Sequence, residues 1–209
     1  MMIFTRRNFP PTACSLALLL LLTSCATRDT RHRVVISVPE QRLALLDEGV
    51  LMATYPISTS KFAIGDLPGS RGTPLGELEI AKKIGEAAPS GAVFKSRRRT
   101  GEILPPNAPG RDPIVSRILW LRGLESRNAN AYSRYIYIHG TAEESTIGTP
   151  ASYGCIRMRS RDVIQLFQVV GFGARVTITD TPLAAIVPVL APAAAQIAAV
   201  EPSQETITR

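Results

Sequence analysis

The chain has 209 residues, a formal net charge of +7 at pH 7, two histidines and three cysteines. This length suits one domain of ordinary size with flanking tails, and so moderate a charge without a recognition motif argues against a nucleic-acid partner. A structural zinc ion needs about four cysteine or histidine ligands, so the composition also argues against a metal site. We expect no cofactor.

The first 24 residues have the pattern of a lipoprotein signal peptide. A basic flank precedes an apolar stretch that is too short to span a bilayer as a mature helix. The segment Leu22-Thr23-Ser24-Cys25 then resembles a lipobox, where bacteria attach diacylglycerol to a cysteine and cleave before it. We predict a signal peptide over residues 1–24, lipidation of Cys25, and a short lipidated linker over residues 25–32. The alternative is an ordinary signal, cleaved or kept as an anchor, whose cysteine is incidental.

The residue after the lipobox bears on location. Ala26 follows Cys25 at the position where an inner-membrane sorting signal carries aspartate. In a Gram-negative cell this favours the outer membrane. We expect an exported protein whose lipid anchors it to the bacterial envelope, facing the periplasm, so that the membrane is one predicted partner.

Processing would leave Cys155 as the one free thiol. Cys14 would leave with the signal peptide and lipid would consume the sulfur of Cys25, so no disulfide can form within one chain. An unpaired thiol in an oxidising compartment is prone to oxidation. A chemical role for Cys155 is therefore favoured over a packing role.

Short strands dominate the pattern between residues 33 and 180. Apolar and β-branched runs predict strands over residues 34–38, 43–46, 50–54, 77–80, 114–121, 135–138 and 175–179. Asp47-Glu48-Gly49 predicts a hairpin turn between the second and third of these strands. Gly72-Thr73-Pro74-Leu75-Gly76 marks a break in the chain before the fourth.

One segment, residues 161–170, has the periodicity of an amphipathic helix. Its apolar residues recur at steps of three and four, and they are Val163, Leu166, Phe167 and Val170. Ser160 is placed to cap the start of this helix and Gly171 to end it. The predicted fold class is mainly β, a mixed sandwich or barrel-like domain with one packed helix near its C-terminal end.

Two segments stand out by composition alone. Residues 95–99 are a basic run, typical of a solvated loop, which can also steer an acidic ligand. Residues 181–209 are rich in alanine and proline and predict a flexible tail, with short helices or a wall contact as the alternative.

A thiol and an imidazole lie in two glycine-containing segments. His139-Gly140-Thr141 is followed, ten residues later, by Ser152-Tyr153-Gly154-Cys155-Ile156-Arg157-Met158. A thiol with a pKa of about 8.5 is mostly protonated at neutral pH and becomes a strong nucleophile beside an imidazole. Cys155 and His139 are thus a candidate nucleophile and base. The alternative is a buried cysteine that acts as a small hydrophobe beside a structural histidine.

Strand alternation gives these two groups a predicted position. Along residues 135–139, His139 shares a face with Tyr135 and Tyr137, while Ile136 and Ile138 face the other way. We expect His139 at a strand end, facing a cleft. Gly140 and Gly154, which adjoin the reactive pair, allow tight turns and close approach to main-chain amides.

These two segments together resemble the signature of the L,D-transpeptidase catalytic domain, the YkuD fold. The sixteen-residue step from His139 to Cys155 agrees with it, and residues 72–76 resemble the threonine-proline-x-glycine turn of the same family. The resemblance covers residues 33–180, which we take as the catalytic domain. It implies a mostly β cysteine acyltransferase that acts on peptidoglycan stem peptides.

The resemblance also implies roles for the residues of the signature. Cys155 would attack a tetrapeptide stem and release D-alanine, leaving a thioester, with His139 as general base and then acid. The carbonyl of Gly140 would orient the His139 ring. Main-chain amides around Tyr153, Gly154 and Cys155 would stabilise the oxyanion.

The remaining signature residues have two interpretations each. Arg157 is predicted to hold a stem carboxylate or, equally, to form a structural ion pair that fixes the loop. Ser152 and Thr141 would hydrogen-bond the substrate or the loop itself. Tyr153 stands where many family members carry histidine, a departure that affects rate and substrate preference more than activity.

Three functions follow from the resemblance. In the first, an amine resolves the thioester, which gives 3-3 crosslinks or attachment of a lipoprotein. In the second, water resolves it, which makes the protein an L,D-carboxypeptidase or endopeptidase. The third is an inactive wall-binding lipoprotein, disfavoured because Cys155, His139 and both adjoining glycines are present.

Overall fold

A computed structural model describes residues 27–188. The predicted signal peptide, the lipidation site Cys25 and residues 189–209 of the predicted tail lie outside the described residues. Within the described part, no helix is both long enough and apolar enough to cross a membrane.

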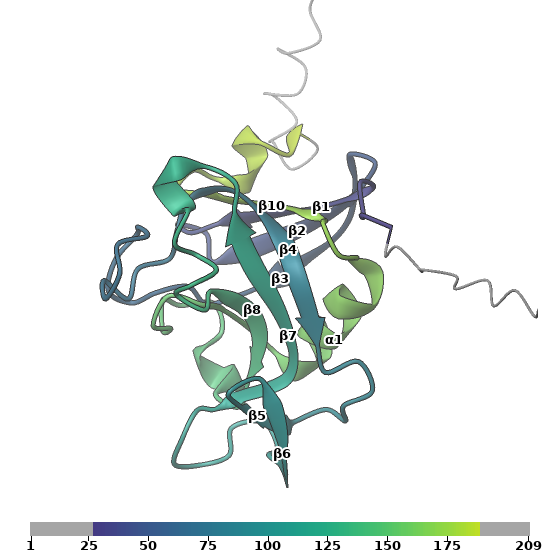
Figure 1. Ribbon diagram of the computed structural model, residues 1–209, viewed down its shortest axis with the longest axis vertical. Coiled ribbons are helices and arrows are strands. Elements are labelled where there is room, and N and C mark those ends of the chain that lie inside the picture. The colour runs from purple at the N-terminus through teal and green to yellow at the C-terminus, as the bar shows by residue number, and fades with distance from the viewer. Residues whose placement is uncertain (1–26, 189–209) are drawn as a thin grey trace, which may run out of the picture.

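Ten strands form one strongly curled sheet (Figure 1). They are β1 His32–Ser37, β2 Arg42–Asp47, β3 Val50–Pro56, β4 Gly76–Ile84, β5 Ala92–Lys95, β6 Arg98–Ile103, β7 Ile114–Gly123, β8 Tyr137–Thr141, β9 Ile156–Met158 and β10 Arg175–Thr179. The order is β3-β2-β1-β10-β4-β7-β5-β6, with β8 paired to β7 and β9 paired to β8. Most neighbours are antiparallel, whereas β1 pairs with β10 and β8 with β9 in parallel. The predicted mainly β fold is confirmed.

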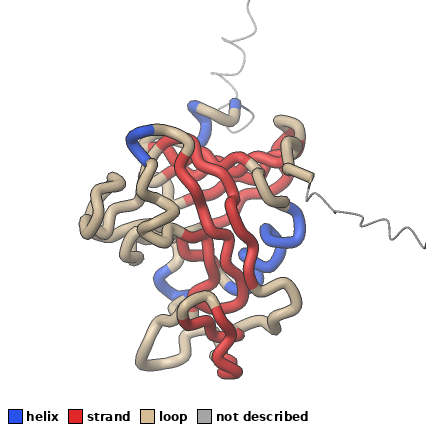
Figure 2. Tube along the Cα trace, in the orientation of Figure 1, coloured by secondary structure: helices blue, strands red, loops and turns tan. Residues whose placement is uncertain are grey.

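One α-helix, α1 Ser160–Val169, packs against β7 and β8 (Figure 2). Its apolar face enters the main core through Val163, Leu166 and Phe167, which are fully buried. Short 3-10 turns lie at Ser126–Asn128, Glu144–Thr146 and Leu183–Ala185. The predicted helix is confirmed, one residue earlier than its predicted bounds.

The caps of α1 differ from the prediction. Ser160 is the first helical residue rather than the cap, and its hydroxyl accepts a hydrogen bond from the Ser116 hydroxyl at 2.8 Å. The Glu144 carboxylate instead accepts the Ser160 N–H at 2.8 Å. A carboxylate at a helix N-terminus is favoured by the exposed N–H groups and the helix dipole. This partner is distant in sequence, so local capping rules miss it.

All seven predicted strands are present, and the hairpin at residues 47–49 joins β2 to β3 as expected. Three strands were missed. Every residue of β6 is exposed, so this strand has no apolar alternation, and β9 has only three residues. The basic run 95–99 is the turn of the β5–β6 hairpin rather than a free loop.

The packed part of the chain continues past residue 180, where we placed the end of the domain. Leu183 and Val187 are buried against Val35, Ala44 and Leu46, on the face of β1 and β2 opposite the main core. The N–H of Leu183 also donates to the Glu40 carboxylate at 2.7 Å. The sequence did not predict these contacts, because Leu183 and Val187 are isolated apolar residues within an alanine- and proline-rich segment.

Candidate active site

His139 lies in the middle of β8, between β7 and β9. It is opposite Ile118 of β7 and beside Arg157 of β9, and its side chain is 5% exposed. Ile136 and Ile138 point into the main core, as the alternation predicted. The expected strand end was wrong, because β8 runs two residues beyond His139.

Glycine is required next to His139 and next to Cys155. A Cβ at Gly140 would lie 2.6 Å from the carbonyl oxygen of Val115 and 3.2 Å from α1 at Val163. Gly154 has φ +119, and a Cβ there would meet the carbonyl oxygen of Gly72 at 3.0 Å. Both glycines therefore allow the chain to pack closely on itself, while the predicted approach of a substrate to these main-chain amides stays a prediction.

The His139 ring is oriented by its own neighbour. Nδ1 lies 2.8 Å from the carbonyl oxygen of Gly140, and since a carbonyl only accepts, Nδ1 carries the proton. Nε2 is then the basic nitrogen. Burial lowers the pKa of His139 to about 4, with the Arg157 charge acting in the same direction and the Gly140 bond against it.

Cys155 is partly exposed and packs against an apolar cluster that contains Ile118 and Tyr137. Its thiol donates to the carbonyl oxygen of Tyr135 at an Sγ–O distance of 3.4 Å. Among residues 27–188, no hydrogen bond joins this thiol to His139. Burial raises the pKa of Cys155 to about 11, opposed by the N–H of Tyr137 and the charge of Arg157. At neutral pH both groups are therefore uncharged.

Both groups open onto one cavity of about 170 Å³. Its lining residues are Asp112, Ile114, His139, Ser152, Tyr153, Cys155 and Arg157. The chain thus brings a thiol, an oriented imidazole and residues of the loop 152–155 to a single concave surface. A cleft with these groups fits acyl transfer through a thioester.

Arg157 is held by two carboxylates. Its guanidinium lies 2.7 Å from Asp112 and 3.3 Å from Glu143, and its side chain is 9% exposed. The other oxygen of Asp112 accepts the Thr141 hydroxyl at 2.5 Å. The structural ion pair, one of the two interpretations of Arg157, is thus present. Sequence reasoning missed Asp112, because only the fold brings residues 112, 141 and 157 together.

Ser152 closes the catalytic loop from within. Its buried hydroxyl donates to the carbonyl oxygen of Cys155 at 2.6 Å and accepts the N–H of Gly154 at 3.1 Å. Thr73, from the predicted threonine-proline-x-glycine turn, is fully buried and donates to the carbonyl oxygen of Gly154 at 3.1 Å. This turn therefore supports the loop that carries Cys155.

Tyr153 is 55% exposed at the mouth of the cavity. Its ring contacts Phe62 at a centroid distance of 5.1 Å. Phe62 belongs to the segment from residue 57 to 75, which we call the rim loop. The sequence singled out only residues 72–75 of this loop and gave no sign of Phe62, which lies about ninety positions before Tyr153.

Metal ligands do not gather in the described part of the chain, where no group of three or more His, Cys, Asp or Glu side chains is arranged to hold an ion.

Comparison with known proteins identifies the family. Residues 31–178 match the YkuD family, the L,D-transpeptidase catalytic domain. The chain is 29% identical to the putative L,D-transpeptidase YqjB of Bacillus subtilis, over 70% of this chain and 70% of that protein. It is 31% identical to the probable L,D-transpeptidase YbiS of Escherichia coli, over 75% of this chain but only 48% of that protein.

A solved structure with a related chain is L,D-transpeptidase 3 from Mycobacterium tuberculosis in complex with a faropenem-derived adduct. It is 16% identical, with a TM-score of 0.48, over 71% of this chain and 60% of that one. The chain thus spans about half to two thirds of the length of several relatives it matches. By the family match over residues 31–178, the chain belongs to the L,D-transpeptidase catalytic-domain family.

Proposed function

We propose that this protein is a peptidoglycan L,D-transpeptidase in which Cys155 is the nucleophile and His139 the general base. One observation carries the proposal: Cys155 opens onto the same cavity as His139, whose Nδ1 bond to Gly140 leaves Nε2 as the base. Family membership supports the same chemistry.

In the first half-reaction, Cys155 attacks the carbonyl carbon of the third residue of a tetrapeptide stem. The thiol first leaves the carbonyl of Tyr135 and passes its proton to Nε2 of His139 as the S–C bond forms. The C–N bond to D-alanine then breaks, and His139 returns the proton to the leaving amine. The product is a thioester between Cys155 and the stem.

The oxyanion of this step needs main-chain donors. The N–H of Gly154 already donates to Ser152, so the proposal assigns the oxyanion to the amides of Tyr153 and Cys155. Gly154 contributes by letting this loop lie close to the carbonyl oxygen of Gly72, which a Cβ would meet at 3.0 Å. Thr141, through Asp112, and Arg157 hold the wall of the cavity.

In the second half-reaction, an amine attacks the thioester. His139 takes the proton of the amine and returns it to the departing thiolate, which restores the neutral pair. A stem-peptide amine gives a 3-3 crosslink, and a lipoprotein amine gives wall attachment. Resolution by water, which gives a tripeptide, is the second candidate function, since the cavity is open to solvent at Tyr153.

We also propose that the protein works at the envelope as a lipoprotein. The lipobox-like segment 22–25 and the residue at position 26 support lipidation of Cys25 and the outer membrane. Metabolic labelling with a radioactive fatty acid should label the wild type and leave Cys25→Ala unlabelled.

The function is tested with purified disaccharide-tetrapeptide and mass spectrometry of the products. Crosslinked dimer with release of D-alanine is the expected result. Tripeptide alone would assign hydrolysis, and unchanged substrate under well-buffered conditions would contradict both enzyme functions.

The nucleophile is tested with a carbapenem, which acylates the reactive cysteine of this family. The wild type should gain the mass of the drug, and Cys155→Ala should gain none. Cys25→Ala is the matched control, because it removes another cysteine and should still be acylated. An adduct on Cys155→Ala would contradict the assignment.

A further inference from the structure

Four side chains gather at the mouth of the cavity, and we call them the cationic rim: Lys61, Phe62, Arg71 and Tyr153. The ammonium of Lys61 lies 4.9 Å from the Tyr153 ring centroid and 5.4 Å from that of Phe62. The guanidinium of Arg71 lies 5.5 Å and 5.4 Å from the same two centroids. Two cations thus share one pair of rings.

Neither cation has a carboxylate partner within residues 27–188. Both cations lie about 5 Å from the same two ring centroids, so each raises the positive potential at the other. Placing two cations together without a counter-charge is typical of a site that receives an anion.

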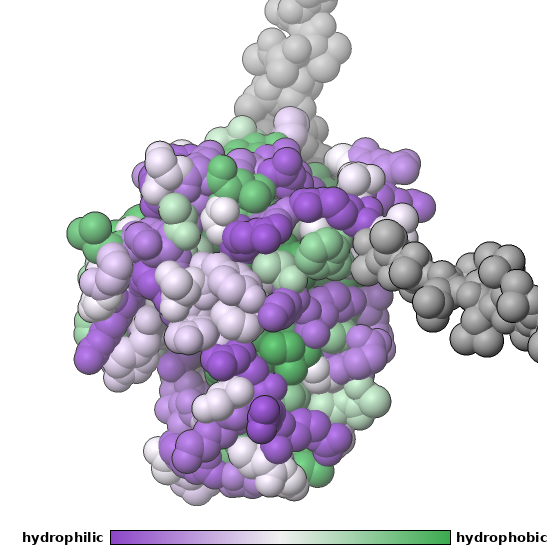
Figure 3. All heavy atoms as spheres, viewed as in Figure 1, coloured by the Kyte–Doolittle hydropathy of each residue, from purple (hydrophilic) through white to green (hydrophobic). Residues whose placement is uncertain are grey.

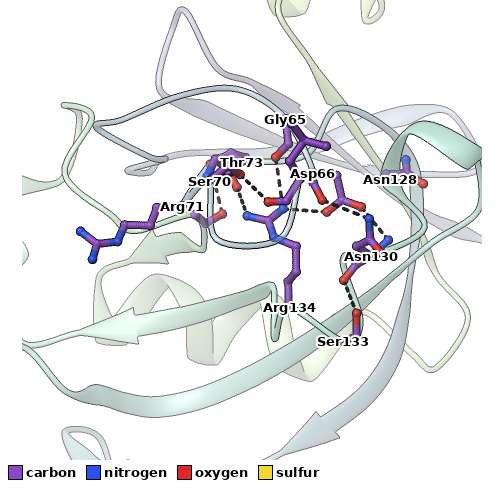
Figure 4. A network of polar contacts seen from close by, with 12 residues as sticks. Gly65, Asp66, Ser70, Arg71, Thr73, Asn128, Asn130, Ser133 and Arg134 are labelled. Carbon is purple, nitrogen blue, oxygen red and sulfur yellow. Dashed lines mark hydrogen bonds and ion pairs between the residues drawn. The ribbon is translucent and has the colours of Figure 1, made fainter.

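Arg134 differs from Lys61 and Arg71, because its guanidinium is bound to groups of the rim loop. Its guanidinium binds Asp66 at 2.7 Å and the carbonyl oxygens of Gly65 at 3.1 Å and Gly72 at 2.8 Å. Figure 4 shows this network, with the side chain of Arg71 extending away from it. The buried arginine therefore stiffens the loop, and Arg71 is left to face solvent.

The backbone of the rim loop is held against the catalytic loop. The Ser60 hydroxyl donates to the carbonyl oxygen of Arg71 at 2.6 Å, and the N–H of Lys61 donates to the carbonyl oxygen of Ser152 at 3.1 Å. Arg71 itself has φ +57, a left-handed conformation that the surrounding contacts maintain. The backbone at Lys61 and Arg71 is therefore held against the loop that carries Cys155.

A second cavity, of about 220 Å³, opens beside the catalytic one. Its lining residues are Gly69, Arg71, Arg134 and Tyr153. Tyr153 lines both cavities, so the cationic rim adjoins the cavity that contains Cys155. On the projecting loop, apolar side chains accompany the charges: Ile64 is 48% and Leu67 75% exposed. Figure 3 shows hydrophobic atoms at the edge of the molecule where Figure 1 draws this loop.

We propose that Lys61 and Arg71, held against the Phe62–Tyr153 ring pair, bind a free carboxylate of the stem peptide and so select carboxylate-bearing over amidated stems. This specificity rests on the proposed function. Arg157, the other cation of the site, is already paired with Asp112 and Glu143, whereas the rim cations are unpaired. A guanidinium binds a carboxylate through two parallel hydrogen bonds, and the rings supply an apolar wall for the adjoining methylene groups.

The experiment compares the wild type with the double variant Lys61→Gln/Arg71→Gln on tetrapeptide stems whose diaminopimelate carboxylate is free or amidated. KM for the free carboxylate should rise roughly tenfold while kcat changes little, because a charge-assisted contact outside the reacting atoms is lost. KM for the amidated stem should stay the same. Equal changes for both stems would overturn the proposal.

Two measurements show whether the donor stem or the acceptor stem supplies the carboxylate. Release of D-alanine from amidated and free donors reports the donor stem, and crosslink formation with amidated and free acceptors reports the acceptor stem. A free-carboxylate preference in either arm that the double variant abolishes supports the site. No preference in either arm overturns it.

A thiol-labelling arm is independent of transpeptidase activity. Iodoacetate carries a carboxylate and iodoacetamide does not, so the ratio of their rate constants at Cys155 reports anion attraction by the rim. This ratio should fall about threefold in the double variant at low salt. An unchanged ratio would contradict anion binding by the cationic rim, even if the wild type proved inactive on every stem.

Matched variants control for net charge and folding. Arg99→Gln/Arg175→Gln removes two exposed cations from β6 and β10 and should leave both the KM values and the labelling ratio unchanged. Lys61→Arg/Arg71→Lys keeps both charges and should retain the preference. If Arg99→Gln/Arg175→Gln lowered the labelling ratio as much as Lys61→Gln/Arg71→Gln does, net charge would explain the effect. That result would overturn the proposal.

Discussion

At the scale of single residues, the proposed nucleophile Cys155 and the proposed base His139 are both uncharged at neutral pH. Burial lowers the pKa of His139 and raises that of Cys155, so the thiolate–imidazolium pair is not the resting state. The proton must then move as the substrate carbonyl is attacked. The thiol donates to the Tyr135 carbonyl in this state, and that hydrogen bond has to break before the proton passes to His139.

This arrangement predicts that the rate of thioester formation falls at a lower pH than it would with an ordinary histidine. A histidine whose pKa lies near 4 stays neutral, and so remains a base, at pH values where an ordinary histidine with a pKa of 6.5 is protonated. Single-turnover acylation, followed by intact mass, should hold its rate from pH 7 down to about 5 and fall as pH approaches 4.

The control for this fall in rate is His139→Gln, which should acylate at least about a hundredfold more slowly and show no such fall. A fall in rate between pH 6 and 7 in the wild type would show that the ring is solvated before attack. That result would contradict the burial described for His139.

At the scale of elements, the rim loop is the support of the catalytic loop. Ser152 pairs with residue 60 in a parallel bridge, and the N–H groups of Ala151 and Ser152 both donate to the carbonyl of Thr59. Thr73 adds a side-chain bond to Gly154 from the other end of the rim loop. The nucleophile therefore depends on a segment about ninety residues upstream.

Thr73→Val tests this support. Valine keeps the shape but removes the buried hydroxyl, which leaves the carbonyl of Gly154 and the N–H of Ser60 each without a partner. The free energy of unfolding should fall by about 1–3 kcal/mol, measured by urea denaturation, and kcat should fall as well. The matched control is Thr149→Val, an exposed threonine whose hydroxyl bonds only locally to Thr146. Equal effects of both substitutions would contradict the support by Thr73.

At the scale of the whole molecule, a buried carboxylate ties the start of the domain to the sheet. Glu79 of β4 is 1% exposed, binds Arg122 of β7 at 2.9 Å, and also pairs with Arg28. Burial alone would raise the pKa of Glu79, but the hydrogen bonds and charges of Arg122 and Arg28 outweigh it and lower the pKa.

The sign of this shift predicts the pH dependence of stability. A lowered carboxyl pKa stabilises the fold above the unfolded value of about 4.3, and this contribution is lost as pH falls through the folded pKa. Glu79→Gln should therefore lower the free energy of unfolding by about 2 kcal/mol at pH 7, with a smaller difference at pH 3. Thermal unfolding measures both.

Glu102→Gln is the control for that comparison, because Glu102 forms an exposed pair with Arg111 and should change stability little. A constant difference between the wild type and Glu79→Gln from pH 7 to pH 3 would contradict the ionised pair at Glu79.

The sequence by itself determined the strands with apolar alternation and helix α1, and it singled out Cys155 and His139, which line one cavity. These features depend on local patterns: alternation along β8 placed His139 opposite the core, and glycine beside each reactive residue signalled a close main-chain approach. Strands β6 and β9 could not be predicted, because an exposed strand and a three-residue strand carry little hydrophobic periodicity.

Only the tertiary structure decided what surrounds the pair. Asp112, which holds Arg157, and the rim loop, which holds the catalytic loop and presents Lys61 and Arg71, are separated from Cys155 by tens of residues. Such contacts follow from strand order and loop docking, because polar side chains on irregular segments have no period from which a partner can be read.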